Sequence, residues 1–76
     1  MLQAIAREIE RYLGANDGAA DSAEGVRGFW LSPALRAAPL EHVIAALDRL
    51  EKRGLIEKRH VGVGFVYAKR APGTLH

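Results

Sequence analysis

The chain has 76 residues, 49% of them hydrophobic and 26% charged, which fits one small globular domain and excludes an intrinsically disordered chain. It has no cysteine, which excludes a disulfide scaffold, a thiolate metal site and a cysteine nucleophile, and it has no apolar run near the roughly 20 residues that span a membrane. The net charge of +2 is small and decides little, whereas the lack of cysteine and of a signal-peptide pattern predicts a cytoplasmic protein that does not bind membranes.

The first residues predict an amphipathic helix. Leu2, Ile5, Ile9 and Leu13 are separated by three or four positions, so they share one face of a helix. Charged residues occupy many of the other positions. Gly14 follows the last apolar residue and is expected to end the helix.

A loop at residues 15–20 and a second helix at 22–31 are expected next. Asp21 or Ser22 can cap this helix, because either side chain can accept a hydrogen bond from a free amide of the first turn. Two glycines inside the segment lower its helix propensity. A short strand over Val26–Leu31 is therefore the alternative.

Two aromatic residues of this segment have a structural and a functional interpretation. Phe29 and Trp30 lie at helical spacing from Val26, which predicts that both belong to the core. The alternative is that they stack on a base or on a partner surface. Leu35, in the proline-bearing connector that follows, is expected to pack beneath the helices, and a brief helical turn is possible at 33–37.

The third helix has the clearest sequence pattern. Its apolar stripe comprises Leu40, Val43, Ile44, Leu47 and Leu50. Pro39 suits the first helical position, where its missing amide costs nothing. Gly54 is expected to be the left-handed residue after the helix, with Leu55 packing back on Leu50.

From Leu55 onwards the hydrophobic period changes from helical spacing to alternation. Leu55–Val61 and Phe65–Arg70 are predicted strands, and Gly62-Val63-Gly64 between them predicts a tight hairpin. The fold class is thus mostly α with a small β-hairpin, an α+β arrangement of three helices. Residues 1–70 are expected to form the single domain and 71–76 a flexible C-terminal tail.

Neither catalysis nor metal binding is predicted. The three histidines, His42, His60 and His76, are expected on a helix, a strand and the tail, without metal-ligand spacing. Ser22 is better explained as a cap, and Ser32 precedes a proline. No glycine-rich phosphate loop precedes a helix, so we expect no enzyme activity and no cofactor.

The charge is unevenly distributed along the chain. Residues 1–48 contain four basic and seven acidic residues, whereas residues 49–70 contain seven basic and two acidic ones. Such a segment can present a positive face to a polyanion. The alternative is a solvated surface that only keeps the domain soluble.

The segment Ile44–Arg59 resembles a known family. Its helix ends in the pattern Leu-x-x-x-Gly-Leu-Ile, from Leu50 to Ile56, and runs directly into a basic strand. Together with the returning strand Phe65-Val66-Tyr67, it is similar to the third helix and the wing of bacterial winged helix-turn-helix transcription regulators. The match is good over residues 40–70 and looser over 1–39. The resemblance implies a three-helix winged helix-turn-helix fold and a function in DNA binding and transcription regulation.

The resemblance also implies which residues would contact double-stranded DNA. The outward positions of the third helix would be Glu41, His42, Ala45, Asp48, Arg49 and Lys52. The DNA-binding residues expected from the helix end and the wing are Arg49, Lys52, Arg53, Lys58, Arg59, His60, Lys69 and Arg70. Their cations would neutralise phosphates on one side of the molecule, and Tyr67 would either contact a phosphate or cover a face of the sheet. A homodimer is possible, because one small module makes few contacts.

A different class of function remains open. The third helix offers few side chains that read base edges, and Glu41 and Asp48 would lie near phosphates. The link between the second and third helices is longer than the three or four residues usual in a helix-turn-helix. The alternative is therefore a winged-helix module that binds a protein and no nucleic acid.

Overall fold

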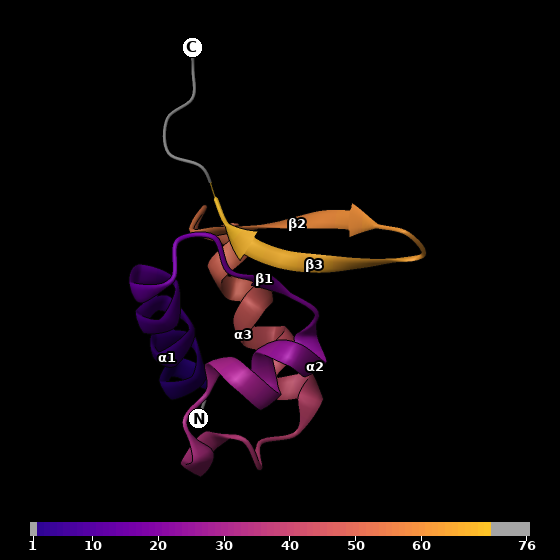
Figure 1. The fold of residues 1–76 in the computed structure, drawn as a ribbon. Helices are drawn as coiled ribbons and strands as arrows, with labels where there is room; N and C mark the ends of the chain where they lie inside the picture. Colours follow the sequence, from indigo (N-terminus) through magenta and orange to yellow (C-terminus); the bar gives the residue numbers. More distant parts are fainter. Residues whose placement is uncertain (1, 71–76) are drawn as a thin grey trace.

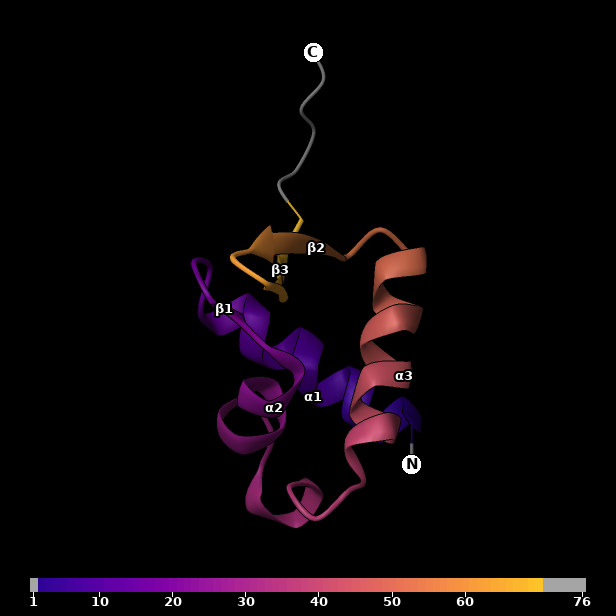
Figure 2. The same cartoon turned by 90° about the vertical axis from the view of Figure 1, so that its right-hand side faces the viewer.

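The structure, a computed structural model, describes residues 2–70. Its elements follow in the order α1 (Leu2–Ala15), β1 (Ala20–Asp21), α2 (Ala23–Gly25), η1 (Val26–Trp30), η2 (Pro33–Leu35), α3 (Leu40–Lys52), β2 (Ile56–Val61) and β3 (Gly64–Lys69) (Figure 1). Three helical segments pack together, and a three-stranded antiparallel sheet lies across one end of them (Figures 1 and 2). This is a small α+β domain, as the sequence predicted, and its element order is compatible with a winged helix-turn-helix. The tail predicted at 71–76 lies outside the described residues.

Helix α1 spans Leu2–Ala15 and buries the face that its periodicity predicts. Ile5, Ile9 and Leu13 lie in the core. The helix passes Gly14 and ends one residue later, so the glycine only approximates the boundary. At this end the Asn16 side-chain amide donates to the Tyr12 carbonyl over 2.9 Å, which satisfies one of the last free carbonyls of the helix.

The expectation of a loop over all of 15–20 is wrong at both ends, because Ala15 belongs to α1 and Ala20 to a strand. Ala20 and Asp21 form the two-residue strand β1, which pairs antiparallel with Ala68 and Tyr67 of β3. Neither alanine nor aspartate favours a strand, and two residues show no alternation. The strand exists because β3 lies beside it and satisfies its backbone groups.

The second helical segment starts as predicted. Ser22 is the N-cap and accepts a hydrogen bond from the Gly25 amide over 3.2 Å. Helix α2 covers Ala23–Gly25 and continues without a break into the π-helical segment η1, Val26–Trp30. The alternative of a strand over 26–31 is therefore wrong. A Cβ at Gly25 would meet the Asp21 carboxylate, so a larger residue there requires this side chain to move.

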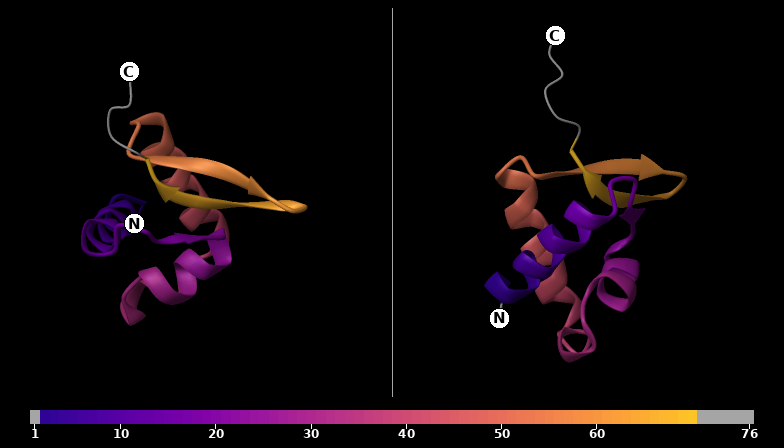
Figure 3. Two further views of the ribbon diagram at one scale, coloured as in Figure 1. Left: turned by 45° about the horizontal axis from the view of Figure 1, so that its top comes forward. Right: turned by 60° about the vertical axis from the view of Figure 1, so that its left-hand side comes forward.

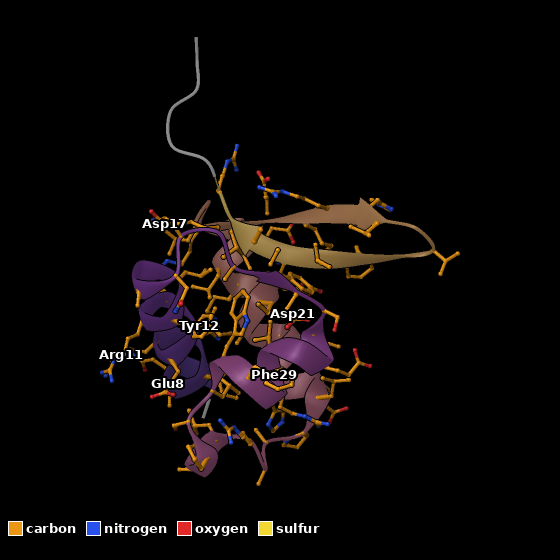
Figure 4. All side chains as sticks on the ribbon, viewed as in Figure 1. Glu8, Arg11, Tyr12, Asp17, Asp21 and Phe29 are labelled. Carbon is orange, nitrogen blue, oxygen red and sulfur yellow. The ribbon has the colours of Figure 1, made fainter. Side chains whose placement is uncertain are left out.

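The two aromatic residues of η1 have different surroundings. Trp30 is buried and stacks on Tyr12 of α1, with ring centroids 4.9 Å apart. Phe29 is 75% exposed, so its predicted place in the core is wrong, and it lies on the outer side of the segment (Figure 4). The wider π turn keeps Val26 and Trp30, four residues apart, on one side and turns Phe29 away.

Helix α3 covers Leu40–Lys52 and follows a 3-10 turn, η2, at Pro33–Leu35. Leu35 packs against the core, as expected. Pro39 is the N-cap and not the first helical residue, because its extended backbone (ψ of 144°) lies outside the helix.

The C-terminus of α3 has the predicted cap. Gly54 has a positive φ of 80°. Its amide donates to the Glu51 carbonyl over 2.9 Å, and the Leu55 amide donates to the Leu50 carbonyl over 3.0 Å. These two bonds form a Schellman motif, which turns the chain directly from the helix into the sheet.

The hairpin consists of β2, Ile56–Val61, and β3, Gly64–Lys69, joined by Gly62 and Val63. Gly62 has a φ of 60° and Val63 does not have a positive φ, which is the pattern of a type II′ turn. Strand β3 is central, in the order β1-β3-β2. The hairpin, residues 56–70, is called the wing below, and its tip projects beyond the helices (Figures 1 and 3).

Candidate nucleic-acid interface

The sheet has a helix-facing face and an outer face, and the pairing register assigns each wing residue to one of them. Lys58 lies opposite Tyr67 and His60 opposite Phe65, and directly opposed residues share a face. Tyr67 is buried in the core, so these four residues face the helices. Arg59 has the opposite orientation and lies on the outer face.

Helix α3 is divided lengthwise by charge. Its core stripe separates two exposed edges, one beside α1 and the other beneath the wing. Arg49 and Arg53 lie four residues apart on the edge beside α1. Asp48 and Glu51 lie three residues apart on the edge beneath the wing, where both approach Lys58. Asp48 also lines a hollow with Arg49, Lys52 and Arg53, so it lies between these cations and Glu51, the carboxylate on the wing side.

The edge beside α1 brings three predicted residues together. Arg49, Lys52 and Arg53 line adjoining hollows, one of which also includes Arg7 of α1. Arg53 pairs with Glu10, with 3.3 Å between Nη1 and Oε2. These four cations, Arg7, Arg49, Lys52 and Arg53, form what we call the basic edge.

Arg7 is the residue of the basic edge that sequence reasoning missed. Along the chain it lies 42 positions before Arg49, within a segment of net negative charge. Only the packing of α1 against α3 places the two arginines in the same hollow. Its position outside the apolar stripe of α1 was the one signal in the sequence, and it did not indicate which helix would lie beside it.

Lys58 is held beneath the wing by carboxylates and aromatic rings. Its Nζ lies 4.0 Å from Asp48 Oδ1 and 4.0 Å from Glu51 Oε1. The same ammonium lies 4.9 Å from the centroid of the Phe65 ring and 5.7 Å from that of Tyr67. The charge of Lys58 is thus directed inward and shared between two acids of α3.

The remaining wing residues are dispersed. Arg59 pairs on the outer face with Glu57, with 2.7 Å between Nε and Oε2. Lys69 faces α1 and pairs over 3.1 Å with Asp17, in the loop at the base of the sheet (Figure 4). The Arg70 amide donates to the Leu55 carbonyl, which extends the ladder by one residue and places this side chain on the outer face.

The eight predicted residues therefore lie on three surfaces. The basic edge contains Arg49, Lys52 and Arg53; the helix-facing side of the sheet contains Lys58, His60 and Lys69; and the outer face contains Arg59 and Arg70. The expectation that their charges combine on one side is not met. Most of the ion pairs are exposed, and such pairs contribute about 0–1 kcal/mol each, so they balance the charge of the cations without fixing them in place.

Of the two roles expected for Tyr67, the structure shows the second: the ring covers the helix-facing side of the sheet and is not exposed to a phosphate of bound DNA. It is 2% exposed, and its ring meets Phe65 edge-on at a centroid distance of 5.7 Å. Burial raises the pKa of the Tyr67 hydroxyl above 10.0, and the charges of Asp48 and Glu51 add to the increase.

This raised pKa gives a testable dependence of stability on pH. A phenol whose pKa is higher in the folded state stabilises the fold fully below the unfolded pKa, and this contribution is lost as pH rises through the folded value. We expect the difference in unfolding free energy between the wild type and Tyr67→Phe to change above pH ~10 in favour of the variant. Urea titrations at about pH 8 and pH 11 measure it, and an unchanged difference would contradict the assignment.

Metal-binding clusters and membrane-spanning helices are both absent from the described part of the chain. Across residues 2–70, no group of three or more His, Cys, Asp or Glu side chains could hold a metal ion. His42, expected to be exposed, is half-buried, and its Nδ1 is buried without a hydrogen-bond partner. In the same residues, no helix has the length and apolar character to cross a membrane.

The fold and the site define a small α+β domain with a projecting hairpin and a cluster of cations where two helices meet. Comparisons with protein-family models, curated proteins and solved structures give no match to this chain. Its function is therefore inferred from the residues of the chain alone.

Proposed function

We propose that this chain is a winged-helix DNA-binding domain, of the type found in bacterial transcription regulators, which contacts the phosphate backbone through the basic edge. The observation that carries the proposal is the convergence of Arg7, Arg49, Lys52 and Arg53 at the junction of α1 and α3. In such a role the domain acts in the cytoplasm, where bacterial DNA lies.

Charge and reach support phosphate contacts at this edge. The carboxylates there are Glu10, which pairs with Arg53, and Asp48, which approaches Lys58, so Arg49 and Lys52 retain their charge for a ligand. Long cationic side chains on a helix reach phosphates without reading bases, and each contact releases counterions. Binding is therefore expected to be sensitive to salt and only weakly selective for sequence.

The wing has a smaller role in this proposal than the resemblance implies. Lys58 and Lys69 face inward and are paired with carboxylates, whereas Arg59 and Arg70 lie on the outer face. The wing is proposed to add contacts through this outer pair only. Glu57 beside Arg59 reduces even that contribution.

The test is a titration of fluorescently labelled mixed-sequence duplex DNA at several salt concentrations between about 50 and 200 mM. Affinity falls as salt rises, so the slope of log affinity against log salt is negative. The double variant Arg49→Ala with Lys52→Ala is expected to make this slope less steep by about two, because it removes two cations that each neutralise one phosphate. The measurement is made by fluorescence anisotropy, with circular dichroism to check that the variant is folded.

The matched control removes two cations from other surfaces. Arg11→Ala with Arg27→Ala changes the net charge by the same amount, and neither residue belongs to the basic edge. We expect the salt slope of this control to match that of the wild type. Equal slopes for both double variants would mean that only net charge matters, and no binding at low salt would eliminate the proposal.

A further inference from the structure

A groove separate from the basic edge lies between α3 and the wing. It encloses ≈ 400 Å³ and is bounded by the start of α2, one edge of α3 and the helix-facing side of β3. Its apolar residues include Ile44, 37% exposed, and Phe65, 43% exposed. Both side chains thus offer partly uncovered surface at the same place. The floor includes Tyr67, which is buried beneath them.

The rim of this groove is acidic. Glu24 of α2 and Asp48 of α3 line it, and Glu51 approaches it through Lys58. Lys58 is the one cation among the lining residues. Three carboxylates against one ammonium leave the rim with an excess of negative charge, which repels a phosphate backbone.

Lys58 also indicates what kind of group the groove accepts. Its ammonium is bound between two carboxylates and the faces of two aromatic rings, and its 4.0 Å distances to both carboxylates are long for ion pairs. Acids and rings arranged in this way recognise a cation attached to an apolar stem. In the unbound chain, Lys58 itself fills this cation site.

We propose that the groove between α3 and the wing binds a protein segment with apolar residues flanked by lysines or arginines. The apolar residues would cover Ile44 and Phe65, and the cations would pair with Asp48, Glu51 and Glu24. This inference does not depend on the proposed DNA-binding function, because none of the four cations of the basic edge lines the groove; Asp48 alone borders both. A partner cation competes with Lys58 for the same acids.

The test uses two synthetic peptides and the full-length chain. One is a short helical peptide of Leu, Ala and Lys, with Leu on one face and Lys on its flanks, and the other has Glu in place of every Lys. The Lys peptide is expected to bind and the Glu peptide not to bind, as measured by fluorescence anisotropy. Equal binding of the two peptides overturns the proposal, as does no binding of either.

Substitutions locate the site. Asp48→Asn with Glu51→Gln keeps side-chain size and is expected to weaken binding of the Lys peptide about fivefold, from the loss of two exposed charge pairs. The matched control, Asp17→Asn with Glu57→Gln, removes two carboxylates that pair elsewhere and leaves binding unchanged. Equal weakening by both double variants overturns the proposal.

Lys58 gives the sharpest discrimination. Lys58→Met keeps the apolar stem and removes the competing charge, so binding of the Lys peptide is expected to become severalfold tighter. If the groove takes a phosphate backbone instead, the same substitution weakens duplex DNA binding and the Lys peptide does not bind. That pair of results overturns the inference, while the basic edge is tested separately by Arg49→Ala with Lys52→Ala.

Discussion

Leu47→Ala is expected to lower the free energy of unfolding by about 2–5 kcal/mol. Leu47 is 0% exposed and lies in the middle of α3, within the core that α1, η1 and the sheet share. Truncation removes buried methyl groups and leaves a cavity that the close-packed surroundings only partly fill. A domain of this length has a total stability of roughly 4–11 kcal/mol, so a large part of it is lost.

The measurement is urea unfolding followed by circular dichroism, with Ile44→Ala as the control on the same helix. Isoleucine has the same number of carbon atoms as leucine, but the Ile44 side chain is partly exposed to water. Its truncation is therefore expected to lower the free energy of unfolding by less, within about 1.5 kcal/mol. Equal costs at the two positions would mean that α3 does not bury the face that contains Leu47.

Gly54→Ala is expected to lower the free energy of unfolding by about 1–2 kcal/mol. The φ of 80° at Gly54 brings a Cβ against the backbone, although no other atom lies within 4 Å of that position. The cost is therefore conformational and independent of packing. The strained residue lies in the connection between α3 and β2.

Two controls separate backbone strain from other causes. Gly54→Asn should cost less than Gly54→Ala, because asparagine tolerates the left-handed region better. Gly28→Ala should stabilise by about 0.5–1 kcal/mol, since its Cβ meets no atom within 4 Å and its φ is not positive. Thermal or urea unfolding of the three variants measures both differences, and a neutral Gly54→Ala would contradict the Schellman assignment.

The elements with a strong local signal were predictable from the sequence. Helix α3 buries Val43, Leu47 and Leu50 of its predicted apolar stripe, although Ile44 is exposed, and Gly54 has the predicted positive φ. The hairpin has a glycine at the first turn position and a run of strand-forming residues, Phe65-Val66-Tyr67, in its second strand. In each case the information lies within a few neighbouring residues, which is the range that propensity and periodicity cover.

The elements that depend on distant contacts were not predictable. Strand β1 is defined by its pairing with β3, whose residues lie more than 40 positions further along the chain. Phe29 follows the apolar spacing of an α-helix, but the π turn in η1 rotates it into solvent. Nothing in the local sequence distinguishes that turn from an ordinary helix.

The candidate site shows the same limit. The sequence shows the excess of cations in residues 49–70, and three of them, Arg49, Lys52 and Arg53, do lie together. It does not show that Lys58 and Lys69 pair with carboxylates distant in sequence, or that Arg7 joins the edge from α1. Charge patterns along a chain become surface charge only after the tertiary fold is known.

The central place of β3 in the sheet has a consequence for how the chain folds during synthesis. Ala68 pairs with Ala20, and Tyr67 completes the core that α1 and α3 begin. A ribosome-bound chain that has emerged only as far as Val66 therefore has its helices without the strand that covers them. Stable, protease-resistant structure is expected to appear in a single step, only after β3 has emerged, because contacts between residues so far apart in sequence form only when both are available.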